Sequence, residues 1–195
     1  MSLSLVTPPV SDVITIDEAK THLRVTDATE DASITTLIKT AQGFLDGEYG
    51  ILGRALVTQT WDLFLKAFPS TGKSIQIPLQ PLQSITSVKY VNPDGNLITL
   101  DASKYIVDTA ENPPLIHAAY GETWPDTRDQ PNAVTIRFVA GYGAAAAVPE
   151  PIKAAMRLLI GHWYQNREPV NIGNITTPLP KMDDALLSAY RKTVF

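Results

Sequence analysis

The chain has 195 residues, 44% of them hydrophobic and 18% charged, a composition typical of a soluble globular protein with one core or two small ones. It has no cysteine, which excludes disulfides, thiolate metal sites and cysteine nucleophiles, and no apolar run approaches the roughly 20 residues that cross a bilayer. The net charge of −4 is uneven, because the first 50 residues carry eight acidic against three basic side chains; a broad phosphate-binding face is not expected there.

Two helices are predicted near the start of the chain. Thr15 and Glu18 have the spacing of a capping box, which predicts a short helix that ends near Leu23. A second helix is predicted after the polar residues 27–31, because apolar side chains recur there at three- and four-residue intervals. Its stripe consists of Ile34, Leu37, Ile38, Ala41, Phe44 and Leu45.

The pattern changes to β-strands over residues 56–148. The sequence Asn92 to Asn96 contains Asp-Gly, which tolerates the positive φ of a tight turn and therefore predicts a hairpin. Short runs rich in β-branched and aromatic residues predict an antiparallel sandwich or small barrel. The expected strands are 56–65, 74–77, 85–91, 97–100, 105–108, 115–118 and 133–140.

Helical periodicity returns at residue 149. Pro149 and Pro151 fit the first turn of a helix, and we expect this helix to be the most buried element. Its apolar face consists of Ile152, Ala155, Met156, Leu159, Ile160 and Trp163. The fold class expected is therefore α+β: residues 1–55 and 149–195 form one discontinuous helical bundle domain, and residues 56–148 are the inserted β domain.

Residues 167–181 are rich in proline and poor in charge, and we expect a mobile arm that either docks on a neighbouring molecule or folds on its own subunit. Asp183 is expected to cap a final short helix that contains Leu186, Leu187 and Tyr190. Arg191 and Lys192 follow near its C-terminus, where the helix dipole favours cations.

No motif predicts a catalytic residue, a cofactor site or a metal site. His22, His117 and His162 lack the spacing of metal ligands. The acidic pairs at predicted helix starts are better explained by capping than by catalysis, and Gly141-Tyr-Gly143 is too short for a nucleotide-binding loop. These acidic pairs are Asp17-Glu18, Glu30-Asp31 and Asp183-Asp184.

Six segments in order resemble the head-tail connector, or adaptor, proteins of tailed bacteriophages and gene transfer agents, in their larger type with a β insertion. The resemblance covers nearly the whole chain, and the ordered set is more specific than any one segment. The segments are IDEAKTHLRV (16–25), ALVTQTW (55–61), IPLQPLQSITSVKY (77–90), FVAGYG (138–143), VPEPIKAA (148–155) and HWYQNRE (162–168).

The resemblance implies a structural protein without enzymatic activity or cofactor, assembled in the host cytoplasm and located in the neck of the virion. Such proteins form a homo-oligomeric ring, usually a dodecamer, beneath the portal protein. DNA passes through the lumen without sequence-specific binding, and a stopper or tail-completion protein attaches on the other side. The C-terminal segment commonly engages the portal.

The residues agree with this implication. A ring needs contacts between unlike patches on neighbouring copies, and an acidic helical part would repel phosphates and let a duplex slide. We expect residues 167–195, and particularly Arg191 and Lys192, to help dock the portal.

Two other classes of function remain open at this point. A β-sandwich that binds carbohydrate or protein on a helical pedestal predicts an exposed row of aromatic side chains on one sheet face. A small hydrolase with dispersed acids predicts at least two carboxyl groups that converge in a pocket.

Overall fold

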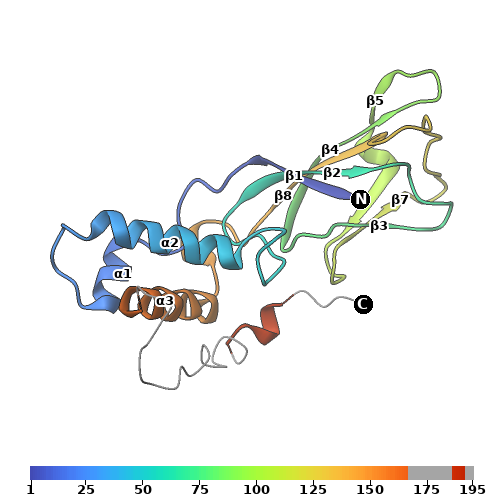
Figure 1. Cartoon of the computed structure of the whole chain (residues 1–195). Helices are drawn as coiled ribbons and strands as arrows, with labels where there is room; N and C mark the ends of the chain where they lie inside the picture. Colours follow the sequence, from blue (N-terminus) through green and yellow to red (C-terminus); the bar gives the residue numbers. More distant parts are fainter. Residues whose placement is uncertain (167–185, 192–195) are drawn as a thin grey trace, which may run out of the picture. The chain divides into compact units, whose positions relative to one another are not determined.

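The computed structural model describes residues 1–166 and 186–191, and over these ranges the chain is α+β, with three α-helices and two antiparallel sheets (Figure 1). The chain divides into two compact units. Met1–Val10 and Thr58–Tyr142 form the β unit, whereas Ser11–Val57 and the described residues from Gly143 onward form the helical unit. The expected arm at 167–181, the cap at Asp183 and the side chain of Lys192 lie outside the described residues.

The first helix of the helical unit, α1 (Ile16–Leu23), begins at the predicted capping box. The Thr15 hydroxyl accepts a hydrogen bond from the Glu18 backbone N–H at 3.2 Å, and the Glu18 carboxylate accepts one from the Thr15 backbone N–H at 2.8 Å. Two N–H groups that lack partners within the helix are thereby satisfied. The prediction of a helix that ends at Leu23 is confirmed.

The second helix, α2 (Asp31–Leu45), buries most of its predicted stripe, including Ile34, Ile38, Ala41 and Leu45. Phe44 differs, because 42% of its surface is exposed. It lies at the margin of the stripe, where its ring meets that of Trp163 edge to face with centroids 6.2 Å apart.

The third helix, α3 (Glu150–Gln165), follows Pro149 and buries five of the six apolar residues predicted for it, together with the stem of Lys153. The sixth, Trp163, is half-buried against Phe44. In Figure 1 the blue helices α1 and α2 lie beside the orange α3, so segments from distant parts of the sequence cover one another's apolar faces. Three 3₁₀ turns complete the short elements of the described residues: η1 (Ala102–Lys104), η2 (Ala145–Ala147) and η3 (Ser188–Tyr190).

The β unit contains all seven predicted strands, with boundaries that shift by a few residues. Every pair of neighbouring strands is antiparallel. The five-stranded sheet has the order β1 (Ser2–Thr7), β2 (Gln59–Leu65), β8 (Val134–Ala140), β4 (Leu82–Val91), β5 (Leu97–Leu100), and the three-stranded sheet has the order β3 (Ile75–Gln76), β7 (Leu115–Ala118), β6 (Tyr105–Asp108).

The central strand β8 separates two different faces of the larger sheet. Phe138 is fully buried on the core face, where its register partners are Trp61 of β2 and Ile85 of β4. On the opposite face Arg137 donates two hydrogen bonds, each 2.8 Å long, to the two carboxylate oxygens of Asp62. The alternation of apolar and polar residues along β8 therefore sets which side of the sheet is the core.

The hairpin between β4 and β5 turns at Asn92 to Asn96, as predicted. Gly95 has a φ of 91°, and its N–H donates to the Asn92 carbonyl at 2.9 Å. The Asn92 side chain also accepts from the Asn96 N–H at 2.8 Å, which closes the turn and fixes the register of β5 on β4.

Strand β1 is not among the predicted strands, and the expectation that its residues belong to the helical domain is wrong. In the structure Ser2–Thr7 pairs with β2, whose residues lie more than 50 positions later in the sequence. The run SLSLVT starts without β-branched or aromatic residues, so its local preference for a strand is weak. Pairing with a distant strand, which no local pattern reveals, makes this segment extended.

Replacement of Phe138 by alanine is expected to lower the free energy of unfolding by about 3–5 kcal/mol, because it leaves a cavity between Trp61 and Ile85. Urea denaturation followed by circular dichroism measures this. Phe64→Ala is the matched control, since Phe64 lies on the opposite face of the same sheet and is only half-buried. Equal losses for the two variants would contradict the assignment of the core face.

Gly161 lets α1 approach α3 closely, since a Cβ there would lie 3.4 Å from the His22 imidazole. We expect Gly161→Ala to be tolerated or to stabilise by up to about 1 kcal/mol, because alanine favours the helix and its methyl makes an ordinary contact. Gly161→Leu should instead destabilise by about 1–3 kcal/mol, because the longer side chain has to displace α1. Thermal denaturation of the two variants measures whether their changes in stability have these opposite signs. If Gly161→Leu stabilised the protein, α1 and α3 would not be packed closely at this position.

Candidate interaction surfaces

The structure places Arg191, one of the two residues predicted to dock a partner, directly after the turn η3. Arg191 is exposed, and its backbone N–H donates to the Leu187 carbonyl at 3.0 Å. Leu187 is fully buried, although the residues around it are exposed or half-buried. The described C-terminal turn, residues 186–191, is thus attached to the helical unit by an apolar anchor.

Arg54 provides a second attachment of this turn. Its Nε donates a hydrogen bond to the backbone carbonyl of Tyr190, across 136 positions of sequence. Sequence reasoning did not identify Arg54, because a single arginine in a glycine-rich loop has no pattern that indicates a partner so far along the chain. No signal in one sequence would have found it.

The loop that carries Arg54 is fixed by its own hydrogen bonds. The Gly47 N–H donates to the Arg54 carbonyl at 2.7 Å, and the Leu56 N–H donates to the Asp46 carboxylate at 2.8 Å. Gly50 has no room for a side chain, because a Cβ would lie 2.4 Å from the Asp46 carbonyl. The backbone position of Arg54 therefore follows from glycine packing and from bonds within the loop.

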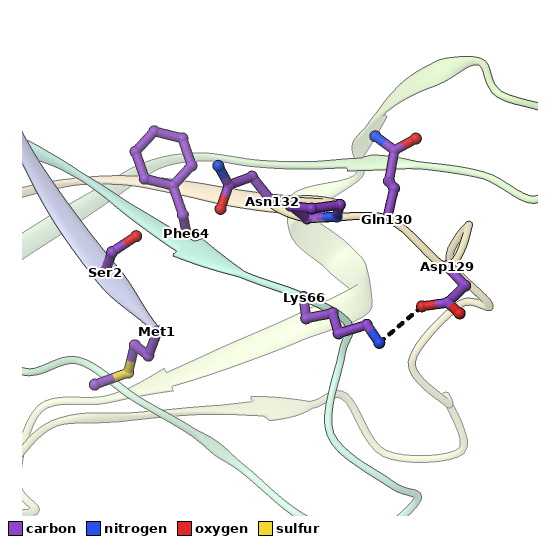
Figure 2. Close-up of a pocket in the computed structure, with 8 residues that line it drawn as sticks. Met1, Ser2, Phe64, Lys66, Asp129, Gln130 and Asn132 are labelled. Carbon is purple, nitrogen blue, oxygen red and sulfur yellow. Dashed lines mark ion pairs between the residues drawn. The ribbon is translucent and has the colours of Figure 1, made fainter.

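A shallow depression of about 500 Å³ lies on the β unit, where the start of β1 and the end of β2 meet the loop before β8 (Figure 2). Met1, Ser2 and Phe64 line one side of it, and the ion pair of Lys66 with Asp129, 2.9 Å long, lies on the other. The hydrogen bond from Lys66 lowers the pKa of the Asp129 carboxyl, and the same bond raises the pKa of Lys66. Both side chains are largely exposed, so this pair adds little to stability and is a poor source of protons at neutral pH.

The clearly shifted carboxyl groups among residues 1–166 and 186–191 have pKa values below the ordinary range. A hydrogen bond from Arg157 lowers the pKa of Glu150, and hydrogen bonds from neighbouring backbone N–H groups lower the pKa of Asp27 and Asp101. A general acid needs the opposite shift. All carboxyl groups whose pKa is clearly shifted in the described ranges are lowered; they are Asp27, Asp101, Asp129 and Glu150.

One recess of the helical unit does contain two carboxyl groups, those of Asp17 and Glu18, together with His22 and Arg157. Consecutive residues of a helix project about 100° apart, so these two groups do not face each other. Glu18 is also held by the capping box with Thr15. The two carboxyl groups therefore lie in this recess because they belong to the first turn of α1, as the capping interpretation predicted.

The aromatic side chains of the β unit do not form an exposed row. Phe68 stacks on Trp124 with ring centroids 5.0 Å apart and meets Tyr90 edge to face at 5.6 Å. The rings cover one another instead of presenting a flat platform, and Tyr120 is the one aromatic residue of this unit, all of which the structure describes, that is largely exposed. The exposed aromatic row that the binding-module alternative predicts is therefore not found on the β unit.

The three histidines lie on separate elements: His22 on α1, His117 on β7 and His162 on α3. Among the residues that the structure describes, no group of three or more histidine and acidic side chains is placed to hold a metal ion. None of the helices in these same ranges has the length and apolar character needed to cross a membrane.

Comparison with known proteins gives structural matches only. No protein-family model and no curated protein matches the chain. A chain from the neck of an empty gene transfer agent (GTA) particle computed with C6 symmetry matches with a TM-score of 0.78 and 24% identity. The match covers 100% of this chain and 97% of the other.

Two further matches have the same extent, 100% of this chain and 97% of the other. One is to a chain of the virion of a native GTA particle, with a TM-score of 0.77 and 24% identity. The other is to a chain of the neck of a native GTA particle computed with C12 symmetry, with a TM-score of 0.72 and 23% identity. The chain therefore shares its fold, over its whole length, with chains of gene transfer agent particles.

Proposed function

We propose that the protein is a structural component of the neck of a tailed phage, prophage or gene transfer agent, and acts there as the head-tail adaptor. The observation that carries this proposal is the match of all of this chain to 97% of a neck chain, because an unrelated protein that shared only one module would match in part. The six ordered sequence segments that resemble connector proteins support the same class independently of the fold.

In this proposal the two segments of the helical unit, Ser11–Val57 and the residues from Gly143 onward, form the connector domain, and the inserted β unit is an antiparallel sandwich or small barrel. Strand β1 belongs to the inserted unit although it lies at the start of the chain. Several acidic groups of the described residues have structural partners, which supports a structural role: Glu18 belongs to a capping box, and Asp31 and Glu150 form ion pairs.

Copies of the chain assemble into a ring, with twelve copies in the virion. The C6 and C12 symmetry used for the related neck structures supports cyclic assembly. Cyclic rings join unlike patches of neighbouring copies, which permits a closed ring of any order. In α1 and the following loop three exposed carboxylates, those of Asp17, Glu18 and Asp27, outnumber one exposed arginine, Arg24. This acidic balance suits a lumen through which DNA slides without being held.

The ring docks on the portal protein through the C-terminal segment, with Arg191 and Lys192 as the docking cations, and receives a stopper or tail-completion protein on its other side. Exposure of Arg191 at the end of the anchored turn supports its part in this contact.

The purified chain mixed with its portal is expected to give a ring with cyclic symmetry on one face of the portal, seen by electron microscopy and counted by native mass spectrometry. The physical reason is that heterologous contacts close only by rotation about one axis. A two-fold dimer, or a chain that stays unassociated in the presence of the portal, would overturn the proposal.

The double variant Arg191→Ala/Lys192→Ala is expected to bind the portal at least about tenfold more weakly at low salt, because two charges leave the interface, with a smaller difference at high salt. Biolayer interferometry at two salt concentrations measures this. Lys73→Ala/Lys89→Ala, which removes two exposed lysines from the β unit, is the matched control and should bind normally. Unchanged affinity of the first variant would remove these cations from the docking contact.

A further inference from the structure

The C-terminal turn is held to the helical unit at two points that differ in chemistry. Leu187 contributes an apolar anchor with no exposed surface. The Tyr190 carbonyl contributes a polar one, since it accepts a hydrogen bond from Arg54 Nε in a partly buried position. A hydrogen bond from a charged donor is stronger than a neutral one, particularly where water is partly excluded.

The backbone of Arg54 is held in place by its loop. Asp46 and Arg54 form a β-bridge, the Gly47 N–H closes on the Arg54 carbonyl, and Gly53 takes a positive φ of 59° beside it. The fixed backbone limits the positions that the guanidinium can reach and keeps it near the Tyr190 carbonyl. The planar guanidinium also loses less freedom per hydrogen bond than an ammonium group does.

We propose that Arg54 positions the C-terminal turn for docking, so that Arg191 is presented to the portal from a preorganised support. This inference rests on the docking role proposed above for Arg191 and Lys192. Tyr190 is bonded to Arg54, and the two cations follow it immediately in the sequence. A segment ordered before binding avoids the entropy loss that a free segment suffers at the interface, and affinity rises accordingly. Arg54 is thus a positioning residue that acts through the Tyr190 carbonyl and need not touch the portal.

The test uses the full chain with four single substitutions. Arg54→Ala removes the polar anchor, and Leu187→Ala weakens the apolar one without a change of charge. Arg54→Lys keeps a positively charged hydrogen-bond donor but lacks the planar guanidinium group. Lys39→Ala is the matched control, since it removes one positive charge from the exposed side of α2 in the same unit.

Hydrogen exchange and binding to the purified portal ring are then measured together. For Arg54→Ala we expect faster exchange of the Arg191 amide, which donates to Leu187, and about tenfold weaker portal binding. Leu187→Ala should have the same two effects, Arg54→Lys should restore part of both, and Lys39→Ala should change neither. A purely structural role for Arg54 would lower the thermal stability without this joint effect on the Arg191 amide and on affinity.

The inference is overturned, and the docking proposal survives, if Arg54→Ala and Leu187→Ala bind the portal normally while Arg191→Ala/Lys192→Ala does not. If the double variant also binds normally, the docking proposal fails and the inference fails with it. Normal exchange of the Arg191 amide in Arg54→Ala overturns the inference whatever the affinity, because the arginine would then not order the turn.

Discussion

The contact between α2 and α3 is the constraint on which the helical unit depends. Each helix has one apolar stripe, and neither α1 nor α2 alone can cover the fully buried side chains of α3, such as Ile152 and Ile160. The chain therefore has to return, after the whole β unit, to complete the core that it began. Gly161 lets α1 come close on one side, and the Phe44 and Trp163 rings close the margin on the other.

Local sequence signals predicted most of this architecture. The capping box at Thr15, the Asp-Gly turn before Asn96 and the prolines at the start of α3 are features whose physical cause lies within a few residues, and each lies where it was predicted. Strand β1 was missed for the converse reason. Its extended form comes from a ladder with β2, and the SLSLVT run has little preference of its own.

The candidate docking surface was predictable in part. Arg191 was singled out because it lies near the C-terminus of a predicted helix, in the segment that the resemblance assigns to portal contact. How the turn before it is held was not predicted. The Arg54 bond joins residues 136 positions apart, and the side chain reaches a backbone carbonyl, which every residue type possesses. Such a contact does not depend on which amino acid occupies position 190. Sequence reasoning could therefore identify the charge of Arg191 but not the hydrogen bond that holds the turn before it.

The chain passes from one unit to the other three times, after Val10, after Val57 and after Tyr142. A single cut of the backbone at an exposed turn of the β unit, such as the one at Gly121, would therefore leave two pieces that each contain part of both units. Antiparallel pairing of β2 with β8 and burial of α2 against α3 would join these pieces without a peptide bond. The protein is accordingly suited to fragment complementation, in which a split chain regains its fold when its halves are mixed.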